Sequence, residues 1–204
     1  MKKLYFVTNF DKYSEEEFLG RVESDLKGGV DILQLREKDK TDREILDLGK
    51  KLKDICDSYK VPMLIDDKPH LAWALGVGVH LGDDDMPIEM ARKLLGEAAL
   101  IGATAKSVDA AKLAEKEGAD YLGVGAIFET KTHVKTKRTS VDTLIEIKKN
   151  VEIEVYAIGG LNIDNVDILE SSGVDGICVV RAIMDSPNVE EDTRKLKEKI
   201  NKIL

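Results

Sequence analysis

Short apolar runs alternate along this chain with longer amphipathic segments. The runs are nearly continuous in apolar residues, as expected of parallel strands that are covered on both faces. They predict strands at residues 4–8, 31–36, 63–65, 78–81, 99–105, 121–128, 155–158 and 176–180. The amphipathic segments predict helices at residues 14–26, 41–59, a short stretch around Trp73, a stretch from Pro87, and residues 108–117, 141–149, 163–171 and 189–204.

Residues that favour helix ends support this division. Thr41 precedes a helical pattern and Glu44 follows three residues later, which is the spacing of a capping box. Pro87 suits a first helical turn. Glycine is favoured just after the last helical residue, because it adopts a left-handed conformation at little cost. Glycines suited to this role are Gly28, Gly29, Gly76, Gly96, Gly118 and Gly173.

The alternation of strands and helices predicts a parallel sheet. Eight strand–helix units in 204 residues favour one compact domain over residues 1–204, an α/β (β/α)8 TIM barrel. An open, doubly wound sheet is the alternative. In a barrel of this kind the functional site lies at the C-terminal ends of the strands. The Lys- and Thr-rich segment 129–140 has no regular pattern, and its length predicts a mobile active-site loop.

Composition narrows the class of protein. The chain has 31 basic and 39 acidic residues, a formal charge of −8, which argues against a general nucleic-acid surface. Cys56 and Cys178 have no disulfide or metal-ligand spacing and are expected to be buried thiols. The N-terminus passes directly into a strand pattern, and no apolar run approaches the ~20 residues of a membrane span. We therefore expect a soluble, cytoplasmic protein without a membrane or nucleic-acid partner.

The end of the second predicted strand carries an amide and two cations. Because successive side chains on a strand face opposite ways, Gln34, Arg36 and Lys38 share one face, and Leu33 and Leu35 share the other. Unpaired buried charge is costly, so these groups are expected to meet an anion. Arg offers a fork for phosphate oxygens and Lys a point charge. The alternative is a strand end whose cations reach solvent or a neighbouring Glu.

Carboxylates follow the third and fourth predicted strands. Asp66 and Asp67 end one strand, and Asp83, Asp84 and Asp85 follow the next. Mg²⁺ favours a few carboxylates together with water and substrate phosphate. Asp67 and Asp85 are the candidates, since they lie at neighbouring strand ends. Alternatively, some of residues 83–85 complement a helix dipole.

A glycine pair follows the seventh predicted strand. Gly159 and Gly160 could let the backbone approach a phosphate, with a helix N-terminus at Asn162 and Arg181 nearby after strand eight. A tight turn without a ligand is equally open. Other polar residues near strand ends are Thr104, Lys106, Thr130, Lys131, Thr132 and His133. His80 lies within a strand and is expected to be a core residue or to support the site from behind.

Taken in order, these motifs resemble the thiamine-phosphate synthase family over nearly the whole chain. The matching stretches are Gln34-Leu35-Arg36-Glu37-Lys38, Ile65-Asp66-Asp67, residues 78–85, residues 120–128, Thr130-Lys131-Thr132, Ala157-Ile158-Gly159-Gly160 and residues 176–180. The resemblance implies a Mg²⁺-dependent transferase of thiamine biosynthesis. It would join the pyrimidinylmethyl group of 4-amino-2-methyl-5-hydroxymethylpyrimidine diphosphate to the nitrogen of 4-methyl-5-(2-phosphoethyl)thiazole, through a dissociative, carbocation-like step. The products would be thiamine phosphate and diphosphate.

The resemblance also implies residue roles. Gln34, Arg36 and Lys38 would hold the pyrimidine diphosphate, Asp66 would contact the pyrimidine, and Thr104 would contact the same substrate. Among these, Arg36, Lys38 and Thr104 would be catalytic. Asp67 and Asp85 would bind Mg²⁺. The thiazole phosphate site would include Thr130, Thr132, Gly160 and Val180. Gly159 is a further candidate there, and Arg181 could either grip the phosphate or crowd the pocket. His133 would stand where the family usually has a diphosphate-binding Lys.

The sequence departs from the family pattern at a few positions. Asp66 stands where Asn is common, Glu129 where Pro is common, His133 where Lys is usual and Arg181 where Ser is usual. These departures keep two alternatives open, a related thiazole tautomerase and a non-catalytic sensor of pyrimidine or thiazole phosphates. Lys106 stands where tautomerases place a His, and retention of Gln34 and Asp85 favours the synthase. A homo-oligomer is compatible with the sequence.

Overall fold

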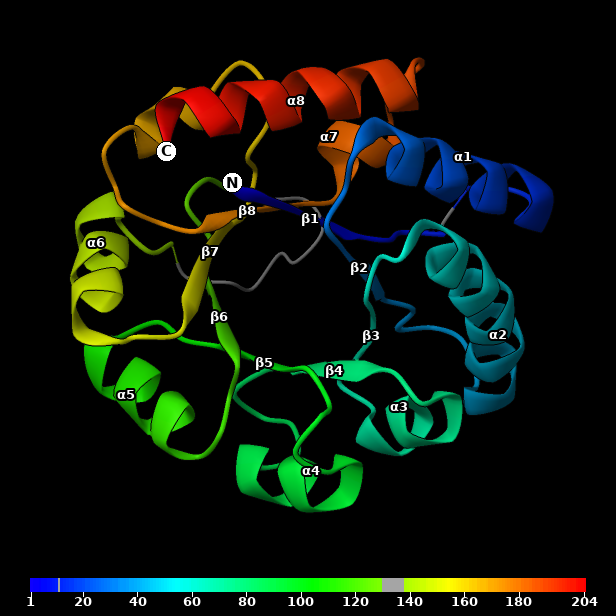
Figure 1. Ribbon diagram of the computed structural model, residues 1–204, viewed down its shortest axis with the longest axis horizontal. Helices are drawn as coiled ribbons and strands as arrows, with labels where there is room; N and C mark the ends of the chain where they lie inside the picture. The colour runs from blue at the N-terminus through cyan, green and yellow to red at the C-terminus, as the bar shows by residue number, and fades with distance from the viewer. Residues whose placement is uncertain (11, 130–137) are drawn as a thin grey trace.

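A computed structural model describes residues 1–10, 12–129 and 138–204. Its strands form one closed parallel barrel in the order β1 to β8 (Figure 1). This closure confirms the predicted (β/α)8 barrel and excludes the open sheet. The strands are β1 (Lys3–Val7), β2 (Ile32–Leu35), β3 (Met63–Asp66), β4 (Gly78–Leu81), β5 (Ile101–Thr104), β6 (Tyr121–Gly125), β7 (Glu154–Ile158) and β8 (Gly176–Val179).

Helices surround the barrel on the outside (Figure 1). They are α1 (Glu15–Gly28), α2 (Asp42–Tyr59), α3 (Pro69–Leu75), α4 (Ile88–Leu95), α5 (Val108–Lys116), α6 (Val141–Asn150), α7 (Arg181–Met184) and α8 (Val189–Ile203), with a 3-10 helix η1 (Val166–Leu169). The capping box of Thr41 and Glu44 is present at the start of α2. Positive φ angles after the helices bear out the predicted glycine ends at Gly29, Gly76, Gly96 and Gly118. Gly173 also has a positive φ, but the helix before it is the 3-10 helix η1 and not an α-helix.

Two predicted elements were wrong in extent or kind, and one short helix was missed. Within the predicted helix 163–171, only Val166–Leu169 is helical, as a short 3-10 helix. The side chains of Asn162 and Asn165 bond to nearby backbone groups and compete with an α-helix. The sixth strand ends at Gly125 and does not reach residue 128. The short helix α7 directly after β8 was not predicted.

Two apolar layers hold the barrel together. The outer layer lies between strands and helices and includes Leu4, Leu33, Leu35 and Phe18. The inner layer fills the barrel itself. Leu33 and Leu35 face outward while Gln34 lines the interior, as the strand alternation predicted.

The inner layer is built around three buried tyrosines. Tyr5, Tyr121 and Tyr156 pack with ring centroids 5.2 to 5.9 Å apart. Gly102 on β5 makes room for one of them, since a Cβ there would lie 1.9 Å from Cζ of Tyr121. Tyr5 and Tyr156 line a cavity at the C-terminal end of the barrel, and Tyr121 lines a second hollow at the opposite end. The tyrosines therefore form the floor of the upper cavity.

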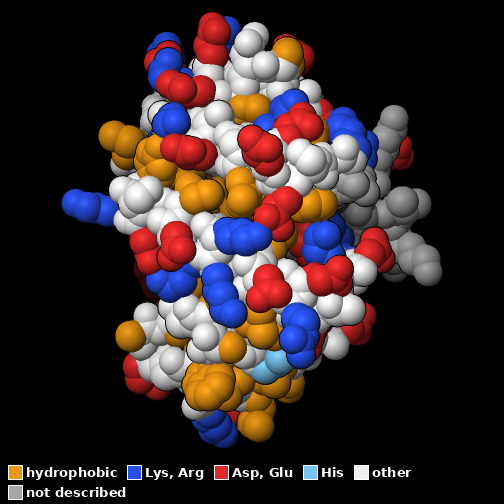
Figure 2. Space-filling model, turned by 90° about the vertical axis from the view of Figure 1, so that its right-hand side faces the viewer, with side chains coloured by type: hydrophobic (Ala, Val, Ile, Leu, Met, Phe, Trp, Pro, Cys, Tyr) orange, Lys and Arg blue, Asp and Glu red, His pale blue; other side chains and the backbone are white. Residues whose placement is uncertain are grey.

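The outer surface carries charges of both signs. On the face in Figure 2, acidic and basic side chains are interspersed, without a continuous basic area. Among the described residues, no helix is long and apolar enough to cross a membrane.

One acidic side chain lies buried between the first and last helices. Asp25 on α1 accepts a hydrogen bond from Thr193 on α8 (2.7 Å), and its second oxygen has no hydrogen-bond partner among the described residues. Burial raises the pKa of Asp25 to about 8, against which the Thr193 bond acts only partly. The helices pack closely here, since a Cβ on Gly28 would lie 2.5 Å from Cβ of Thr193.

We expect Asp25 to make the free energy of unfolding depend on pH. The pKa of Asp25 in the folded protein lies above the ordinary value of about 4. The contribution of the protonated carboxyl to the free energy of unfolding is therefore complete below pH ~4 and is lost as pH rises through about 8. Asp25→Asn keeps the acceptor for Thr193 and removes the titration. Urea unfolding between pH ~4 and pH ~8 should show that the free energy of unfolding falls less with pH in the variant than in the wild type. The same dependence of the free energy of unfolding on pH in both proteins would contradict the raised pKa of Asp25.

Candidate functional site

The main cavity lies at the C-terminal ends of the strands and has a volume of about 580 Å³. Every strand or the loop that follows it contributes to its lining. The predicted site residues within the lining are Gln34, Arg36, Lys38, Asp66, Asp67, Asp85, Thr104, Gly159, Gly160, Val180 and Arg181. Thr130, Thr132 and His133 lie outside the described residues. One cavity thus brings together all the predicted positions that the structure describes.

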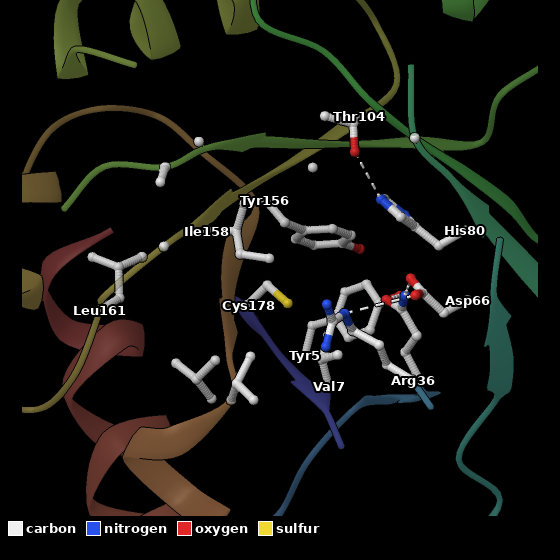
Figure 3. Close-up of a pocket in the computed structure, with 18 of the residues that line it drawn as sticks. Tyr5, Val7, Arg36, Asp66, His80, Thr104, Tyr156, Ile158, Leu161 and Cys178 are labelled. Carbon is white, nitrogen blue, oxygen red and sulfur yellow. Dashed lines mark hydrogen bonds and ion pairs between the residues drawn. The ribbon is translucent and has the colours of Figure 1, made fainter. Parts of the chain in front are cut away.

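Cations from β2 face carboxylates from β3. Lys38 Nζ pairs with Asp66 Oδ2 at 2.9 Å and also with Asp67, while Arg36 Nε lies 3.7 Å from Asp66 Oδ2. Figure 3 shows Arg36 and Asp66 directed toward each other across the cavity wall. The side chain of Asp66 is only 10% exposed, so this pairing offsets much of the cost of burying its charge.

Asp67 has an unusual backbone conformation. Its φ is +59°, in the left-handed region, and its N–H donates to the carbonyl of His80 on β4. Such a conformation costs free energy in a residue other than glycine, and it turns Asp67 away from the direction of the strand. Asp66 and Asp67 therefore both line the cavity, although an extended strand would have sent them to opposite sides.

The acidic run after β4 lies in a loop, ahead of α4. Asp85 Oδ2 accepts a hydrogen bond from the Gly82 N–H at 2.6 Å, and Asp83 pairs with Lys106 at 2.5 Å. The N-cap of α4 is Pro87, so these aspartates do not cap the helix. Among the described residues, no three His, Cys, Asp or Glu side chains gather as a metal site.

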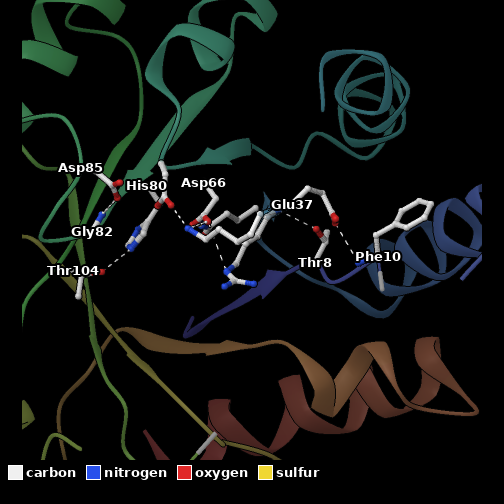
Figure 4. A network of polar contacts seen from close by, with 12 residues as sticks. Thr8, Phe10, Glu37, Asp66, His80, Gly82, Asp85 and Thr104 are labelled. Carbon is white, nitrogen blue, oxygen red and sulfur yellow. Dashed lines mark hydrogen bonds and ion pairs between the residues drawn. The ribbon is translucent and has the colours of Figure 1, made fainter. Parts of the chain in front are cut away.

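His80 belongs to the cavity more directly than its sequence position indicated. Its ring nitrogens contact the Tyr121 hydroxyl (Nδ1, 3.0 Å) and Thr104 Oγ1 (Nε2, 3.2 Å; Figure 4). Burial lowers the pKa of His80, which favours the neutral ring. Sequence analysis missed Tyr5 and Tyr156 in the lining. Gly102 and Gly123 do signal large inward side chains on neighbouring strands, but those side chains are Tyr121 and His80.

The glycine pair after β7 is explained by backbone packing. Gly159 and Gly160 have φ of +105° and +65°. A Cβ on Gly159 would lie 2.5 Å from Cβ of Ala126, and one on Gly160 would lie 2.7 Å from Cβ of Phe128. The predicted helix N-terminus at Asn162 is absent, since η1 begins at Val166. The turn still lines the cavity beside Val180 and Arg181.

The buried thiol at the cavity floor is not a candidate nucleophile. Cys178 lines the cavity, and burial, with Asp66 nearby, raises the pKa of its thiol. A thiol must ionise to react readily. The site therefore combines cations, carboxylates and hydroxyls, which suits binding of phosphorylated ligands and electrostatic chemistry.

Comparisons with known proteins agree with this site. A family model described as "Thiamine monophosphate synthase" matches residues 4–183. "Thiamine-phosphate synthase 2" of Streptococcus pneumoniae is 44% identical over 99% of this chain and 97% of the relative. "Thiamine-phosphate synthase" of Enterococcus faecalis is 40% identical, covering 99% of this chain and 96% of the relative.

A solved structure shares the architecture as well. The thiamine phosphate pyrophosphorylase from Pyrococcus furiosus has a TM-score of 0.90 and 36% identity, covering 99% of this chain and 96% of that one. The family match spans most of the chain, and the relatives align over nearly their full lengths. On these grounds the chain belongs to the thiamine monophosphate synthase family.

Proposed function

We propose that this protein is a thiamine-phosphate synthase, a transferase of thiamine biosynthesis. It joins the pyrimidinylmethyl group of 4-amino-2-methyl-5-hydroxymethylpyrimidine diphosphate to the nitrogen of 4-methyl-5-(2-phosphoethyl)thiazole. The observation that carries the proposal is the convergence of Arg36 and Lys38 with Asp67 and Asp85 on one cavity at the strand ends. We place the reaction in the cytoplasm, in keeping with two unpaired, buried cysteines.

The chemistry needs stabilisation of separating charge more than a base. The bond from the methylene carbon to the diphosphate oxygen breaks, and its electron pair leaves with the diphosphate. The thiazole nitrogen then supplies the pair for the new carbon–nitrogen bond, so no proton must be removed. Fixed cations near the departing oxygens stabilise such a step most, because they are oriented before the charge develops.

Arg36 and Lys38 are placed to act on the diphosphate. In the ligand-free arrangement Lys38 is held by Asp66 and Asp67, and Arg36 lies beside Asp66. Binding of the diphosphate would draw Lys38 from this pairing toward phosphate oxygens. Arg36 offers a planar fork for the same group. Gln34, whose amide bonds to Asp66, would hold the ring end of this substrate together with Asp66 and Thr104.

The carboxylates fit a magnesium ion. Mg²⁺ is usually held by one or two carboxylates, with water and substrate phosphate completing its shell. Asp67 and Asp85 supply this number, and the Gly82 bond engages one oxygen of Asp85. Bound magnesium would neutralise charge on the leaving diphosphate. Asp66 lies beside this pair, with its Oδ2 facing Lys38 Nζ at 2.9 Å.

The opposite side of the cavity suits the second substrate. Gly159, Gly160, Val180 and Arg181 line it together. We propose that these residues, with Thr130 and Thr132, receive the thiazole phosphate, and that His133 takes the place of a diphosphate-binding Lys. Arg181 at the start of α7 would contribute a cation there.

The direct test is formation of thiamine phosphate by the purified protein. We expect diphosphate release that requires both substrates and stops with EDTA, with thiamine phosphate identified by mass. Mg²⁺ added in excess should restore the rate. Binding of either substrate without product would favour the sensor. Conversion of a thiazole substrate to its tautomer without the pyrimidine would favour the tautomerase.

Asp67→Ala and Asp85→Ala should each lower the turnover number by about a hundredfold or more, because each removes a proposed magnesium ligand. Thermal unfolding should stay near that of the wild type. Asp47→Ala, an exposed carboxylate on α2, is the matched control and should keep full activity. Near-normal rates in both cavity variants would remove the metal assignment.

Arg36→Ala should lower kcat by about a hundredfold and change KM much less, because its cation acts on charge that develops during the reaction. Arg36→Lys should recover only part of the loss, since an ammonium cannot bind two oxygens in the same plane. Arg194→Ala on the exposed face of α8 controls for loss of an arginine. An unchanged kcat for Arg36→Ala would exclude Arg36 from the site.

A further inference from the structure

A chain of hydrogen bonds, buried between the two tyrosines and part-buried toward its ends, runs across the floor of the cavity (Figures 3 and 4). It begins at Asp66, which accepts from the Gln34 amide at 2.5 Å, and ends at Thr104. Its members, in order, are Asp66, Gln34, Tyr5, Tyr121, His80 and Thr104. Each hydroxyl has a single proton to donate, so the direction of one bond determines the direction of the next.

The direction is set at Asp66. Its carboxylate faces Lys38 Nζ at 2.9 Å and Arg36 Nε at 3.7 Å, so it is an acceptor. Gln34 must then point Nε2 toward Asp66, which leaves Oε1 facing Tyr5. The Tyr5 hydroxyl lies 2.6 Å from this Oε1 and donates to it.

The same reasoning continues through the second tyrosine. Tyr5 has used its proton on Gln34, so the 2.7 Å contact between the two hydroxyls is donated by Tyr121. Burial raises the pKa of both phenols, so both keep their protons. Tyr121 has then no proton left for His80. The 3.0 Å contact to His80 must be donated by Nδ1–H.

The last step decides the role of Thr104. Both ring nitrogens of His80 contact hydroxyls, and no carboxylate pairs with the ring among the described residues, so nothing compensates a second proton. The single proton is on Nδ1, which donates to Tyr121. Nε2 is therefore an acceptor, and the Thr104 hydroxyl donates to it at 3.2 Å. Thr104 also lines the cavity. With its proton committed to His80, Oγ1 can offer a ligand only lone pairs.

We propose that this chain of hydrogen bonds fixes Thr104 Oγ1 as an acceptor facing the cavity, where it selects a ring substrate that carries an N–H donor. This inference rests on the proposed function, in which the N–H donor facing Thr104 is the exocyclic amine of the aminopyrimidine. His80 is a positioning residue, because it acts through Thr104. A ring with a carbonyl in place of the amine would bring two acceptors together and bind more weakly.

The strands are shaped to keep this chain intact. His80, Gly102 and Tyr121 occupy one row across β4, β5 and β6. The middle position has no side chain, which lets the Tyr121 hydroxyl reach His80 over it. A Cβ on Gly123, the partner of Thr104 in the next strand, would lie 3.2 Å from the His80 ring. Both glycines therefore open space for the contacts that orient Thr104.

The first experiment reads the proton position on His80 directly. Nitrogen-15 NMR of the labelled, ligand-free protein distinguishes the two neutral tautomers and the imidazolium. His80→Gln assigns the resonances by their disappearance, and His70→Gln on the exposed face of α3 is the matched control. We expect the Nδ1–H tautomer. An Nε2–H tautomer or a doubly protonated ring at pH 7 would overturn the proposal, whatever the activity of the protein.

The second experiment measures selection by Thr104. Calorimetry compares binding of the aminopyrimidine diphosphate with binding of its 4-oxo analogue, with Mg²⁺ and without the thiazole. We expect about tenfold tighter binding of the amine by the wild type and by Thr104→Ser, and loss of this preference in Thr104→Val. Equal affinity of the wild type for the amine and the 4-oxo analogue would overturn the selection by Thr104. A preference for the amine that survives in Thr104→Val would overturn it as well. Binding of neither compound would refute the proposed substrate and with it the selection, while the tautomer would still test the hydrogen-bond chain.

Discussion

The packing of three tyrosines inside a barrel of eight strands is the constraint on which the rest of the site depends. Rings of this size fit only where a neighbouring strand supplies glycine, as Gly102 does for Tyr121. Their hydroxyls are buried, so each must find a hydrogen-bond partner or cost free energy. The Tyr5 and Tyr121 hydroxyls bond to Gln34, His80 and each other, and the Tyr156 hydroxyl donates to Glu154. A polar floor thus follows from the way the barrel is filled, and it decides how the groups above it are oriented.

Electrostatic pairing governs the wall above this floor. Without a ligand, Lys38 and Arg36 compensate the carboxylates of β3, so the site carries charges of both signs at short range. Breaking such pairs is costly unless a replacement of similar charge arrives at the same time. A diphosphate that arrived with a divalent cation would replace both partners of these ion pairs. Lys38 and Arg36 would gain phosphate oxygens, and the carboxylates would gain a metal ion. This arrangement favours joint binding of a diphosphate and magnesium over either alone.

Much of the fold could be predicted because its signals are local. Apolar runs, the Thr41 capping box and glycine helix ends each depend on a few adjacent residues, and strand alternation correctly placed Gln34 opposite Leu33 and Leu35. The clustering of Arg36, Asp67 and Asp85 in one cavity followed from the rule that barrel sites lie at the strand ends. The hydrogen bonds of His80 could not be predicted, because they depend on register across three strands and on the space left by glycines. Residues 163–171 had the spacing of a helix, but side-chain bonds from Asn162 and Asn165 favour a turn.

The tyrosine layer also determines how solvent can reach the reaction. Tyr5 and Tyr156 face the upper cavity and Tyr121 faces the hollow below, so the rings stand between the two ends of the barrel. A pyrimidine cation formed above them would meet bulk water from one direction, through the mouth where the substrates enter. Under the proposed reaction, the competition between coupling and hydrolysis would depend on how completely the second substrate fills that mouth. The ratio of coupled to hydrolysed product would then follow the fraction of sites in which the second substrate is bound at the mouth of the cavity.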